Sequence, residues 1–260
     1  MKEIYIIFCS SLILFMCCAG LHQAHSQKQT QAFKNPQVPL DFVADSIAFL
    51  LSEKILIEHP RNAESLNQAS YLASRLTGST SNPQRKELYI KMAVYYAQQS
   101  IEIEPRAKEA HLNYIIALGL LSEIEKNPSE KLRHANVIKA EADYLLSIDS
   151  LYAPAHFALG KWHLSLASLS WFEKAACDIL FGGMPREASL ETALRCFEKA
   201  IQLQSDNILF HYNKALALHK LGYSVEAVNV LKYTLKLPLR DVNDTIRKNN
   251  CMALLNKLYQ

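Results

Sequence analysis

Nine histidines are spread through the 260 residues, and two pairs of them fall on single predicted helices. His156 and His163 are seven positions apart, and His211 and His219 are eight apart. Two ligands on one helix reach a common metal ion when they lie three or four positions apart, as in HExxH. The observed spacing therefore predicts no metal site. His156, His163 and His211 fall instead at positions that repeat along the chain and are expected to face a core.

Motifs for catalysis are missing from the sequence as well. It contains no GxSxG or SxxK motif, and no cysteine has a histidine beside it. Carboxylate pairs such as Glu102 and Glu104 are expected on helix ends or surfaces. The Gly182-Gly183 step does not belong to a GxGxxG or GxxxxGK[ST] phosphate-binding loop. We therefore predict no catalytic residues and no cofactor, and a protein that is not an enzyme.

The charge of the chain argues against nucleic acid as a partner. There are 28 basic and 25 acidic residues, giving a net charge of +3, and the two signs are interleaved along the predicted helices. A nucleic-acid-binding protein needs a concentrated basic stripe. The observed pattern is typical of a solvated helical surface.

The first 26 residues have the pattern of a cleavable export signal. A short basic start precedes an apolar run from Ile4 to Cys18, and Ala24 and Ser26 place small residues three and one positions before the predicted cleavage site. We therefore predict cleavage after Ser26 and a periplasmic or secreted location. Two alternatives are an uncleaved N-terminal anchor and lipoprotein processing at Cys17 or Cys18.

The rest of the chain divides into a leader and a helical domain. Residues 27–39 are polar and contain two prolines, which predicts a flexible leader. Over residues 40–260, apolar residues recur at three- and four-residue spacing, which is the helical period. The chain has only seven glycines, too few for the turns of an all-β fold. Turn signals divide the domain into about eleven helices.

Three of the six cysteines lie beyond the predicted signal, namely Cys177, Cys196 and Cys251. Their number is odd and they form no CxxC motif. This predicts the absence of a disulfide framework and leaves one bridge among the three open.

The helices follow a repeated template. When Pro60, Pro105, Ser150 and Ser205 are taken as turn positions, the same template fits four times. Small residues before each turn let the two helices of a hairpin approach closely, and larger residues after it fill the space between hairpins. The template residues 12, 8 and 5 before the turns are Ala48, Ser52 and Ile55; Ala93, Ala97 and Ser100; Ile138, Ala142 and Leu145; and Ala193, Phe197 and Ala200. Those 6, 9 and 13 after them are Leu66, Ala69 and Ala73; His111, Tyr114 and Leu118; His156, Leu159 and His163; and His211, Lys214 and Leu218.

Hairpins of this kind cannot bury their apolar faces alone, so we predict an all-α solenoid of stacked hairpins. The hairpins resemble tetratricopeptide repeats. The run from Tyr152 to Gly160 is similar to the first helix of such a repeat, and the run from Ala193 to Ala200 to the second. The turns are 45, 45 and 55 residues apart, which indicates longer helices or insertions relative to the usual repeat of about 34 residues. Lys214 stands where an apolar residue is expected.

Part of the chain resembles the regulator of microtubule dynamics family and its bacterial relatives. The resemblance lies in Leu159-Gly160-Lys161-Trp162, Leu169-Ser170-Trp171-Phe172-Glu173-Lys174, Phe181-Gly182-Gly183-Met184-Pro185 and Ala188-Ser189-Leu190-Glu191. It implies tetratricopeptide-like repeats with an extra helix inserted after the third repeat turn, and a binding scaffold as the function. Because an exported protein meets no microtubules, tubulin is not expected as a partner.

The extra helix is expected over Ser170–Leu180, inside an insertion from Leu166 to Ser189. The aromatic residues of this region either pack the extra helix against the solenoid or shape a pocket beside it. The two glycines are expected in a tight turn that needs positive φ. The residues that characterise the insertion are Trp162, Trp171, Phe172, Gly182, Gly183 and Pro185.

The candidate binding site follows from repeat geometry. The first helices of stacked hairpins line a concave groove, into which the positions 7 and 11 after each turn point. These positions, with a rim residue 15 after the first turn, predict a groove formed by Tyr71, Arg75, Leu112, Ile116, Phe157, Lys161, Tyr212 and Leu216. An apolar and aromatic groove suits an amphipathic helix or an acyl chain. Alternatively, extra helices fill the groove and these side chains are ordinary core.

We therefore predict an exported scaffold that binds a peptide or protein partner in its groove. A first alternative is a carrier of a lipid or another amphiphile in the same groove. A second alternative is an accessory subunit of an envelope complex.

Overall fold

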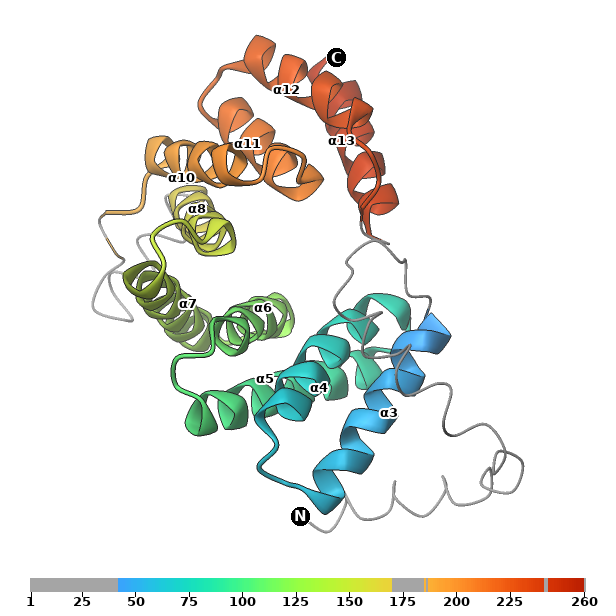
Figure 1. The fold of residues 1–260 in the computed structure, drawn as a ribbon. Coiled ribbons are helices and arrows are strands. Elements are labelled where there is room, and N and C mark those ends of the chain that lie inside the picture. Colours follow the sequence, from blue (N-terminus) through green and yellow to red (C-terminus); the bar gives the residue numbers. More distant parts are fainter. Residues whose placement is uncertain (1–41, 170–184, 186, 241–242, 260) are drawn as a thin grey trace. The chain divides into compact units, whose positions relative to one another are not determined.

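The structure is a computed structural model that describes residues 42–169, 185, 187–240 and 243–259 (Figure 1). These residues belong to one compact unit, Leu40–Gln260. Its described regular structure is helical throughout, with ten α-helices and one short 3₁₀ helix. The predicted all-α fold is confirmed. The extra helix expected over Ser170–Leu180 lies outside the described residues.

The helices follow one another through short connections, except between α8 and α10, where most of the intervening residues lie outside the described part of the chain. In chain order they are α3 (Phe42–Glu58), α4 (Ala63–Leu76), the 3₁₀ helix η2 (Thr77–Ser79), α5 (Pro83–Ile103), α6 (Lys108–Ile124), α7 (Pro128–Ile148), α8 (Ala153–Ala167), α10 (Leu190–Leu203), α11 (Ile208–Lys220), α12 (Ser224–Lys236) and α13 (Asp244–Leu258).

Asparagine side chains begin several of these helices. At the start of α4, Oδ1 of Asn62 accepts a hydrogen bond from the backbone N–H of Ser65 at 2.8 Å. Asn82, Asn127 and Asn207 cap α5, α7 and α11 in the same way. A side-chain cap satisfies one of the N–H groups that have no partner inside the helix. Both α5 and α7 also start with proline, which has no N–H to satisfy.

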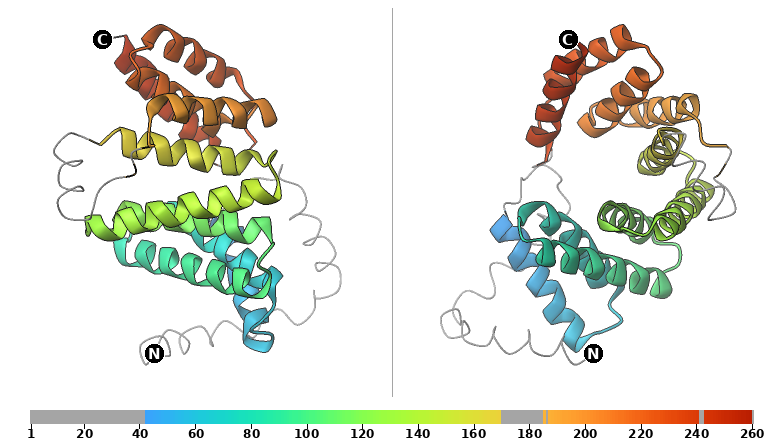
Figure 2. Two further views of the ribbon diagram at one scale, coloured as in Figure 1. Left: turned by 90° about the vertical axis from the view of Figure 1, so that its left-hand side faces the viewer. Right: turned by 180° about the vertical axis from the view of Figure 1, so that it is seen from behind.

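The helices form two rows. Helices that are adjacent in the described chain pack against each other throughout the unit. Further contacts join α4 to α6, α6 to α8, α8 to α11 and α11 to α13, which defines an inner row. The outer row consists of α3, α5, α7, α10 and α12, each packed against inner helices (Figures 1 and 2). This is the arrangement of stacked helical hairpins.

The small template residues lie where the two rows meet. Ala93 and Ala97 of α5 and Ala193 of α10 are fully buried. Ser70 is buried as well, and its hydroxyl donates a hydrogen bond to the backbone oxygen of Ala93 at 2.8 Å. Ile55 departs from the template because it is 42% exposed. It lies on α3, which packs against one inner helix, α4.

Gly160 lets α10 approach α8 closely. A Cβ atom at this position would lie 2.5 Å from Cε1 of Phe197, far inside van der Waals contact. The Phe197 side chain is fully buried, and its ring also contacts that of Phe157 at a centroid distance of 5.7 Å. The absence of a side chain at Gly160 is therefore what makes room for this aromatic ring.

Lys214 takes the place of an apolar template residue without leaving an unpaired charge in the contact. Its Nζ lies 2.9 Å from a carboxylate oxygen of Glu198 on α10. The lysine is half-buried, so its methylene groups lie against the helices while its charge is paired. At this position an ion pair joins α10 to α11 in place of the expected apolar contact.

Candidate functional site

Three residues of the predicted groove are exposed on the inner row. Tyr71 of α4 is 39% exposed, Ile116 of α6 is 40% exposed, and Lys161 of α8 is also exposed. Each lies eleven positions after its turn, so the three occupy the same repeat position on successive inner helices. Equivalent positions of stacked repeats line up along one face. We call Tyr71, Ile116 and Lys161 the inner patch.

Lys161 is the charged member of the inner patch. Although its side chain is exposed, the protein around it excludes part of the water and lowers the pKa of its amine below 10.5. The charge of Glu123 on α6 acts in the opposite direction. A partly dehydrated ammonium gains more from an anionic partner than a fully hydrated one does. Lys161 is therefore suited to receive a carboxylate or another anion.

Arg75, the expected rim residue, connects two helices. Its Nε lies 2.8 Å from a carboxylate oxygen of Asp45 on α3, and Asp45 is buried. Its guanidinium also donates to the hydroxyl of Tyr71 at 3.2 Å. Arg75 thus holds the Tyr71 ring in place and anchors α3 to α4.

The other groove residues are half-buried and take part in the core. The Phe157 ring stacks on Phe210 at a centroid distance of 4.8 Å, so it joins α8 to α11. Tyr212 and Leu216 pack against a cluster that includes Cys251 of α13. Leu112 is also half-buried. The structure thus separates the predicted set into the exposed inner patch and residues that mainly hold the helices together.

A histidine contact recurs in three repeats. In each, the histidine six positions after the turn lies within hydrogen-bonding distance of the backbone oxygen of the turn residue. The backbone oxygen of each turn residue lies just after the end of the preceding outer helix, so it has no hydrogen-bond donor within that helix. The contacts are His111 Nε2 to Pro105 O at 2.9 Å, His156 Nε2 to Ser150 O at 2.9 Å, and His211 Nε2 to Ser205 O at 2.8 Å.

The first of these histidines has a second partner. His111 Nδ1 lies 2.5 Å from a carboxylate oxygen of Glu141 on α7, and the His111 side chain is nearly fully buried. The hydroxyl of Tyr144 donates to the same Pro105 oxygen at 2.7 Å. These contacts join the α5–α6 turn to α7. The pattern of histidines was visible in the sequence, but the backbone oxygens that they bind were not.

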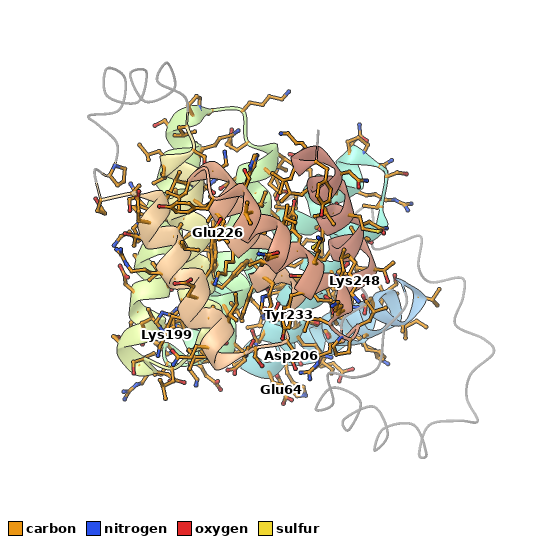
Figure 3. The ribbon with its side chains drawn as sticks, turned by 90° about the horizontal axis from the view of Figure 1, so that it is seen from above. Glu64, Lys199, Asp206, Glu226, Tyr233 and Lys248 are labelled. Atoms are coloured by element: carbon orange, nitrogen blue, oxygen red, sulfur yellow. The ribbon has the colours of Figure 1, made fainter. Side chains whose placement is uncertain are left out.

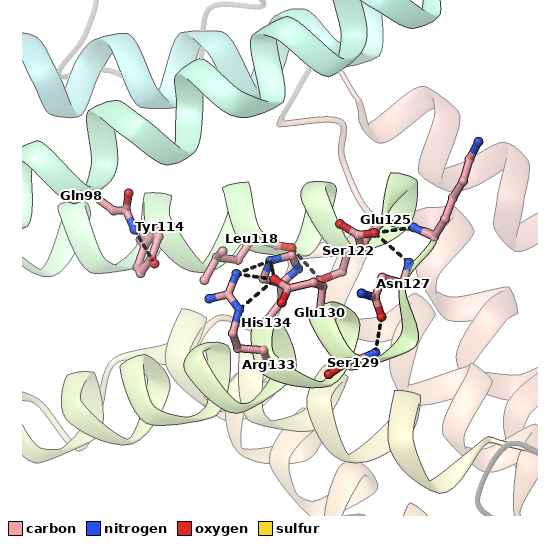
Figure 4. Close-up of polar contacts among 11 residues, drawn as sticks. Gln98, Tyr114, Leu118, Ser122, Glu125, Asn127, Ser129, Glu130, Arg133 and His134 are labelled. Carbon is pink, nitrogen blue, oxygen red and sulfur yellow. Dashed lines mark hydrogen bonds and ion pairs between the residues drawn. The ribbon is translucent and has the colours of Figure 1, made fainter. Parts of the chain in front are cut away.

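A second buried histidine lies between α6 and α7 (Figure 4). His134 is 2% exposed, and its Nε2 lies 3.1 Å from a guanidinium nitrogen of Arg133. Because arginine only donates, Nε2 of His134 must be the acceptor, which makes the imidazole neutral. Burial lowers the pKa of His134, and the charge of Arg133 lowers it further. The ring is therefore held in its uncharged form.

We expect the protein to lose stability as the pH falls from about 7.5 to about 5.5. Burial lowers the pKa of His134, His163 and His211 below the ordinary value of 6.5. As the pH falls through that value, the unfolded chain binds protons that the folded chain does not, so unfolding becomes more favourable. For each such proton, the free energy of unfolding changes by up to about 1.4 kcal/mol per pH unit. Thermal unfolding at several pH values, followed by circular dichroism, measures this dependence.

Two variants make this pH test specific. His134→Gln removes one of the buried titrating groups and should reduce the slope of stability against pH. His59→Gln changes an exposed histidine and should leave the slope unchanged. A stability that is the same at both ends of the pH range, or an equal effect of the two variants, would contradict the assignment.

The insertion is described in part. Trp162 is 4% exposed, its ring meets that of His163 edge-on at 4.8 Å, and Nζ of Lys139 lies 5.6 Å above the indole. Pro185 is half-buried. The remaining residues expected to characterise the insertion, Trp171, Phe172, Gly182 and Gly183, lie outside the described residues.

Other kinds of site were sought among the described residues. They contain no group of three His, Cys, Asp or Glu side chains that could hold a metal ion. Cys196 and Cys251 are free thiols, and Cys177 lies outside the described residues. Burial raises the pKa of Cys196 and raises that of Cys251 to about 11, so neither is an activated nucleophile. In the same part of the chain, each helix is too short or too polar to cross a membrane.

Two rows of stacked helical hairpins with an exposed patch on the inner row define a helical-repeat protein of the tetratricopeptide type. The fold is similar to the crystal structure of a thermophilic TPR protein from Thermus thermophilus, with a TM-score of 0.59. The two chains are 15% identical in sequence, and the match covers 87% of this chain and 96% of the other. A fold of this type suggests a scaffold for protein interactions.

The chain belongs to the family described as regulator of microtubule dynamics protein 1-3, whose model matches residues 24–259. It is 25% identical over 224 residues to the bovine regulator of microtubule dynamics protein 3, a match that covers 84% of this chain and 43% of the relative. It is 27% identical over 190 residues to protein 1 of Caenorhabditis elegans, covering 70% of this chain and 79% of the relative. The chain spans less than half the length of the mammalian relatives that it matches. The resemblance noted in the sequence is thus confirmed.

Proposed function

We propose that this protein is a scaffold that binds a polypeptide on its inner row of helices and performs no chemistry. The observation that carries the proposal is the inner patch. Tyr71, Ile116 and Lys161 expose an aromatic, an aliphatic and a basic side chain at one repeat position of three successive inner helices. Aromatic and aliphatic anchors beside a charged group are the usual elements of peptide recognition.

The chemistry of the inner patch describes the partner. An apolar side chain of the partner would lie against Tyr71 and Ile116, and an acidic side chain or carboxylate would lie near Lys161. Because the three residues belong to different helices, the bound segment would have to run along the row. An extended peptide or an amphipathic helix with an acidic residue fits this description.

Three features support a binding role over an enzymatic one. The two described thiols have raised pKa values, and the buried histidine beside Arg133 is held neutral by structural contacts. The polar contacts of His111 with Glu141 likewise join helices. These groups stabilise the fold, and they do not converge on a site for a reacting molecule.

The place of action is proposed from the N-terminal sequence. The apolar run from Ile4 to Cys18, followed by small residues at Ala24 and Ser26, supports export with cleavage after Ser26. The partner would then be a polypeptide of the periplasm or the exterior. Tubulin, which the family name suggests, is not included in this proposal.

The inner patch is tested by removing its side chains together. A photoreactive side chain at Gln68, one helical turn from Tyr71, should crosslink to a polypeptide when the protein is illuminated in its own compartment. The triple change Tyr71→Ala, Ile116→Ala and Lys161→Ala should lower the crosslinked yield at least about tenfold, because loss of three contacts weakens binding by more than about 1.4 kcal/mol. Mass spectrometry identifies the product.

A matched triple variant controls for nonspecific effects. Tyr95, Leu88 and Lys91 are exposed on the outer helix α5 and offer the same three kinds of side chain. Changing them to alanine should leave the crosslinked yield unchanged, and both triple variants should keep the helical circular dichroism signal. Equal yields from the two triple variants would refute binding at the inner patch. A crosslinked product with the added mass of a lipid would show that the ligand is an amphiphile and not a polypeptide.

A further inference from the structure

Tyr71 of the inner patch has an orientation that a neighbouring side chain fixes. Nη1 of Arg75 donates a hydrogen bond to Oη of Tyr71 at 3.2 Å, and the guanidinium carbon lies 5.6 Å from the centre of the tyrosine ring. A guanidinium group only donates, so Oη of Tyr71 is the acceptor in this bond. The hydroxyl proton of Tyr71 has no acceptor among the described residues, and it is therefore free to be donated to a bound molecule.

Arg75 is held in turn by α3. Its Nε lies 2.8 Å from Oδ2 of Asp45, and the two side chains are 14% and 4% exposed. An ion pair so far removed from water is screened less than a surface pair, so it restrains its members more strongly. Arg75 uses different nitrogens for its two contacts, which lets one planar group hold both the carboxylate and the phenol. A series of contacts thus runs from a buried carboxylate on α3 to an exposed side chain of the inner patch.

A second polar contact of the same kind joins α3 to a neighbouring helix. The hydroxyl of Tyr96 on α5 donates to a carboxylate oxygen of Glu53 at 3.0 Å. The partner of Asp45 reaches the inner patch, whereas the partner of Glu53 belongs to the outer row. The two contacts therefore allow the attachment of α3 to be separated from the orientation of Tyr71.

We infer, on the basis of the proposed function, that Asp45 and Arg75 are positioning residues of the inner patch: while α3 packs on α4, they hold Tyr71 so that its hydroxyl donates to the bound polypeptide. The ring of Tyr71 still meets an apolar side chain of the polypeptide. Beside that side chain, the polypeptide must present a hydrogen-bond acceptor, such as a carbonyl or carboxylate oxygen. Without Asp45 or Arg75, the tyrosine would have to be ordered on binding, which lowers the affinity.

Fluorine NMR tests the positioning on the purified protein, without any partner. A 3-fluorotyrosine in place of Tyr71 keeps the hydroxyl and reports the surroundings of the ring. Asp45→Asn removes the charge with almost no change of shape, and the side chain that Asp45 binds is Arg75. This change should move the resonance at Tyr71 towards the position that it has in urea-unfolded protein, because a released ring samples several rotamers. An unchanged resonance would overturn the inference.

Tyr233 on α12 is the control position for this measurement (Figure 3). It is 51% exposed, and its ring contacts that of His211 at a centroid distance of 5.2 Å. The resonance of a 3-fluorotyrosine in place of Tyr233 should not respond to Asp45→Asn. Shifts of equal size at Tyr71 and Tyr233 would mean that the change acts on the whole protein, and they would contradict a specific effect on the inner patch.

Two further variants separate positioning from the attachment of α3. Tyr96→Phe removes the bond to Glu53 and leaves Arg75 in place, so the resonance at Tyr71 should stay nearly unchanged. Arg75→Lys keeps a positive charge beside Asp45 and loses the second nitrogen that reaches Tyr71, so it should move the resonance as Asp45→Asn does. A full shift in Tyr96→Phe, or none in Arg75→Lys, would overturn the inference.

The effect on binding is measured with the photoreactive side chain at Gln68. Asp45→Asn and Arg75→Lys should each lower the crosslinked yield about two- to tenfold, since one more side chain must be ordered on binding. Tyr71→Phe removes the donated proton and should lower the yield by a similar factor, with no further loss when it is combined with Asp45→Asn. Tyr96→Phe should leave the yield unchanged. An undiminished yield in Tyr71→Phe would show that the hydroxyl does not act as a donor and would overturn its assigned role.

The triple change of the inner patch distinguishes the positioning role from the proposed function itself. If the triple change lowers the crosslinked yield and Asp45→Asn does not, binding at the inner patch stands and the positioning role of Asp45 is overturned. If the triple change leaves the yield as it is, the proposed function fails. The positioning role in binding then falls with it, even where the resonance at Tyr71 shifts.

Discussion

Replacing Phe197 with alanine is expected to lower the free energy of unfolding by about 3–5 kcal/mol. The ring is fully buried, packs with Leu164 of α8 and Ala217 of α11 in one cluster, and meets the ring of Phe157. Its removal would leave a cavity where α8, α10 and α11 meet, which the surrounding helices can close only in part. Urea unfolding followed by circular dichroism measures the loss. A change below about 1 kcal/mol would show that this aromatic ring is not central to the core.

The same site offers a test of close packing. Gly160→Ala should destabilise the protein by about 1–3 kcal/mol, because the added methyl group would meet the Phe197 ring. In the Phe197→Ala background the clash is gone, and the change should be neutral or stabilising by up to about 1 kcal/mol through helix propensity. A double-mutant cycle isolates this coupling.

Gly119 provides the matched control for Gly160. It also lies inside an inner helix, α6, but a Cβ atom there would meet nothing within 4 Å. Gly119→Ala should therefore stabilise the protein by about 0.5–1 kcal/mol in either background. If both glycine variants behaved alike, the contact between α8 and α10 would not depend on the missing side chain at Gly160.

Replacing Trp162 with alanine is the second change with a large expected effect, again about 3–5 kcal/mol of unfolding free energy. The indole is almost completely buried on α8, against His163 and beneath the amine of Lys139. Its N–H has no hydrogen-bond acceptor among the described residues. Trp162→Phe should therefore cost much less than Trp162→Ala, since it keeps an aromatic ring and removes an unpaired donor.

Fluorescence adds a second readout for Trp162. The chain has two tryptophans, so comparison of the emission of the Trp162→Phe variant with that of the unmodified protein gives the contribution of Trp162. A buried indole should emit at shorter wavelength than an exposed one. A loss below about 1 kcal/mol in Trp162→Ala would show that the ring is free for recognition and not part of the core.

Much of the repeat architecture could be predicted from residue types and spacing. Ala93 and Ala97 lie at the predicted helix contact because only small residues allow two helices to approach closely. The break at Asn127-Pro128 is a helix start, since an asparagine cap and a proline favour that local conformation whatever surrounds them. Helix starts and helix contacts of this kind depend on residues that are close in sequence or that recur at a fixed spacing. The order of residue types along the chain is therefore enough to predict them.

The candidate site could be predicted only in part. Spacing placed Tyr71, Ile116 and Lys161 at one repeat position, and the structure shows that all three are exposed on the inner row. Phe157, seven positions after its turn, was predicted to line the same groove, yet it stacks on Phe210. Whether an aromatic residue faces solvent or core depends on what the next hairpin places opposite it, and spacing along one helix does not contain that information.

The sequence by itself determined the helical period, the turn positions, the small residues at helix contacts and the family. Only the tertiary structure decided that Arg75 anchors α3 through Asp45 and that His111 binds Glu141. The physical reason is the range of the interactions. Propensity, capping and periodicity act within a few residues, whereas ion pairs and burial between helices join residues about 30 positions apart.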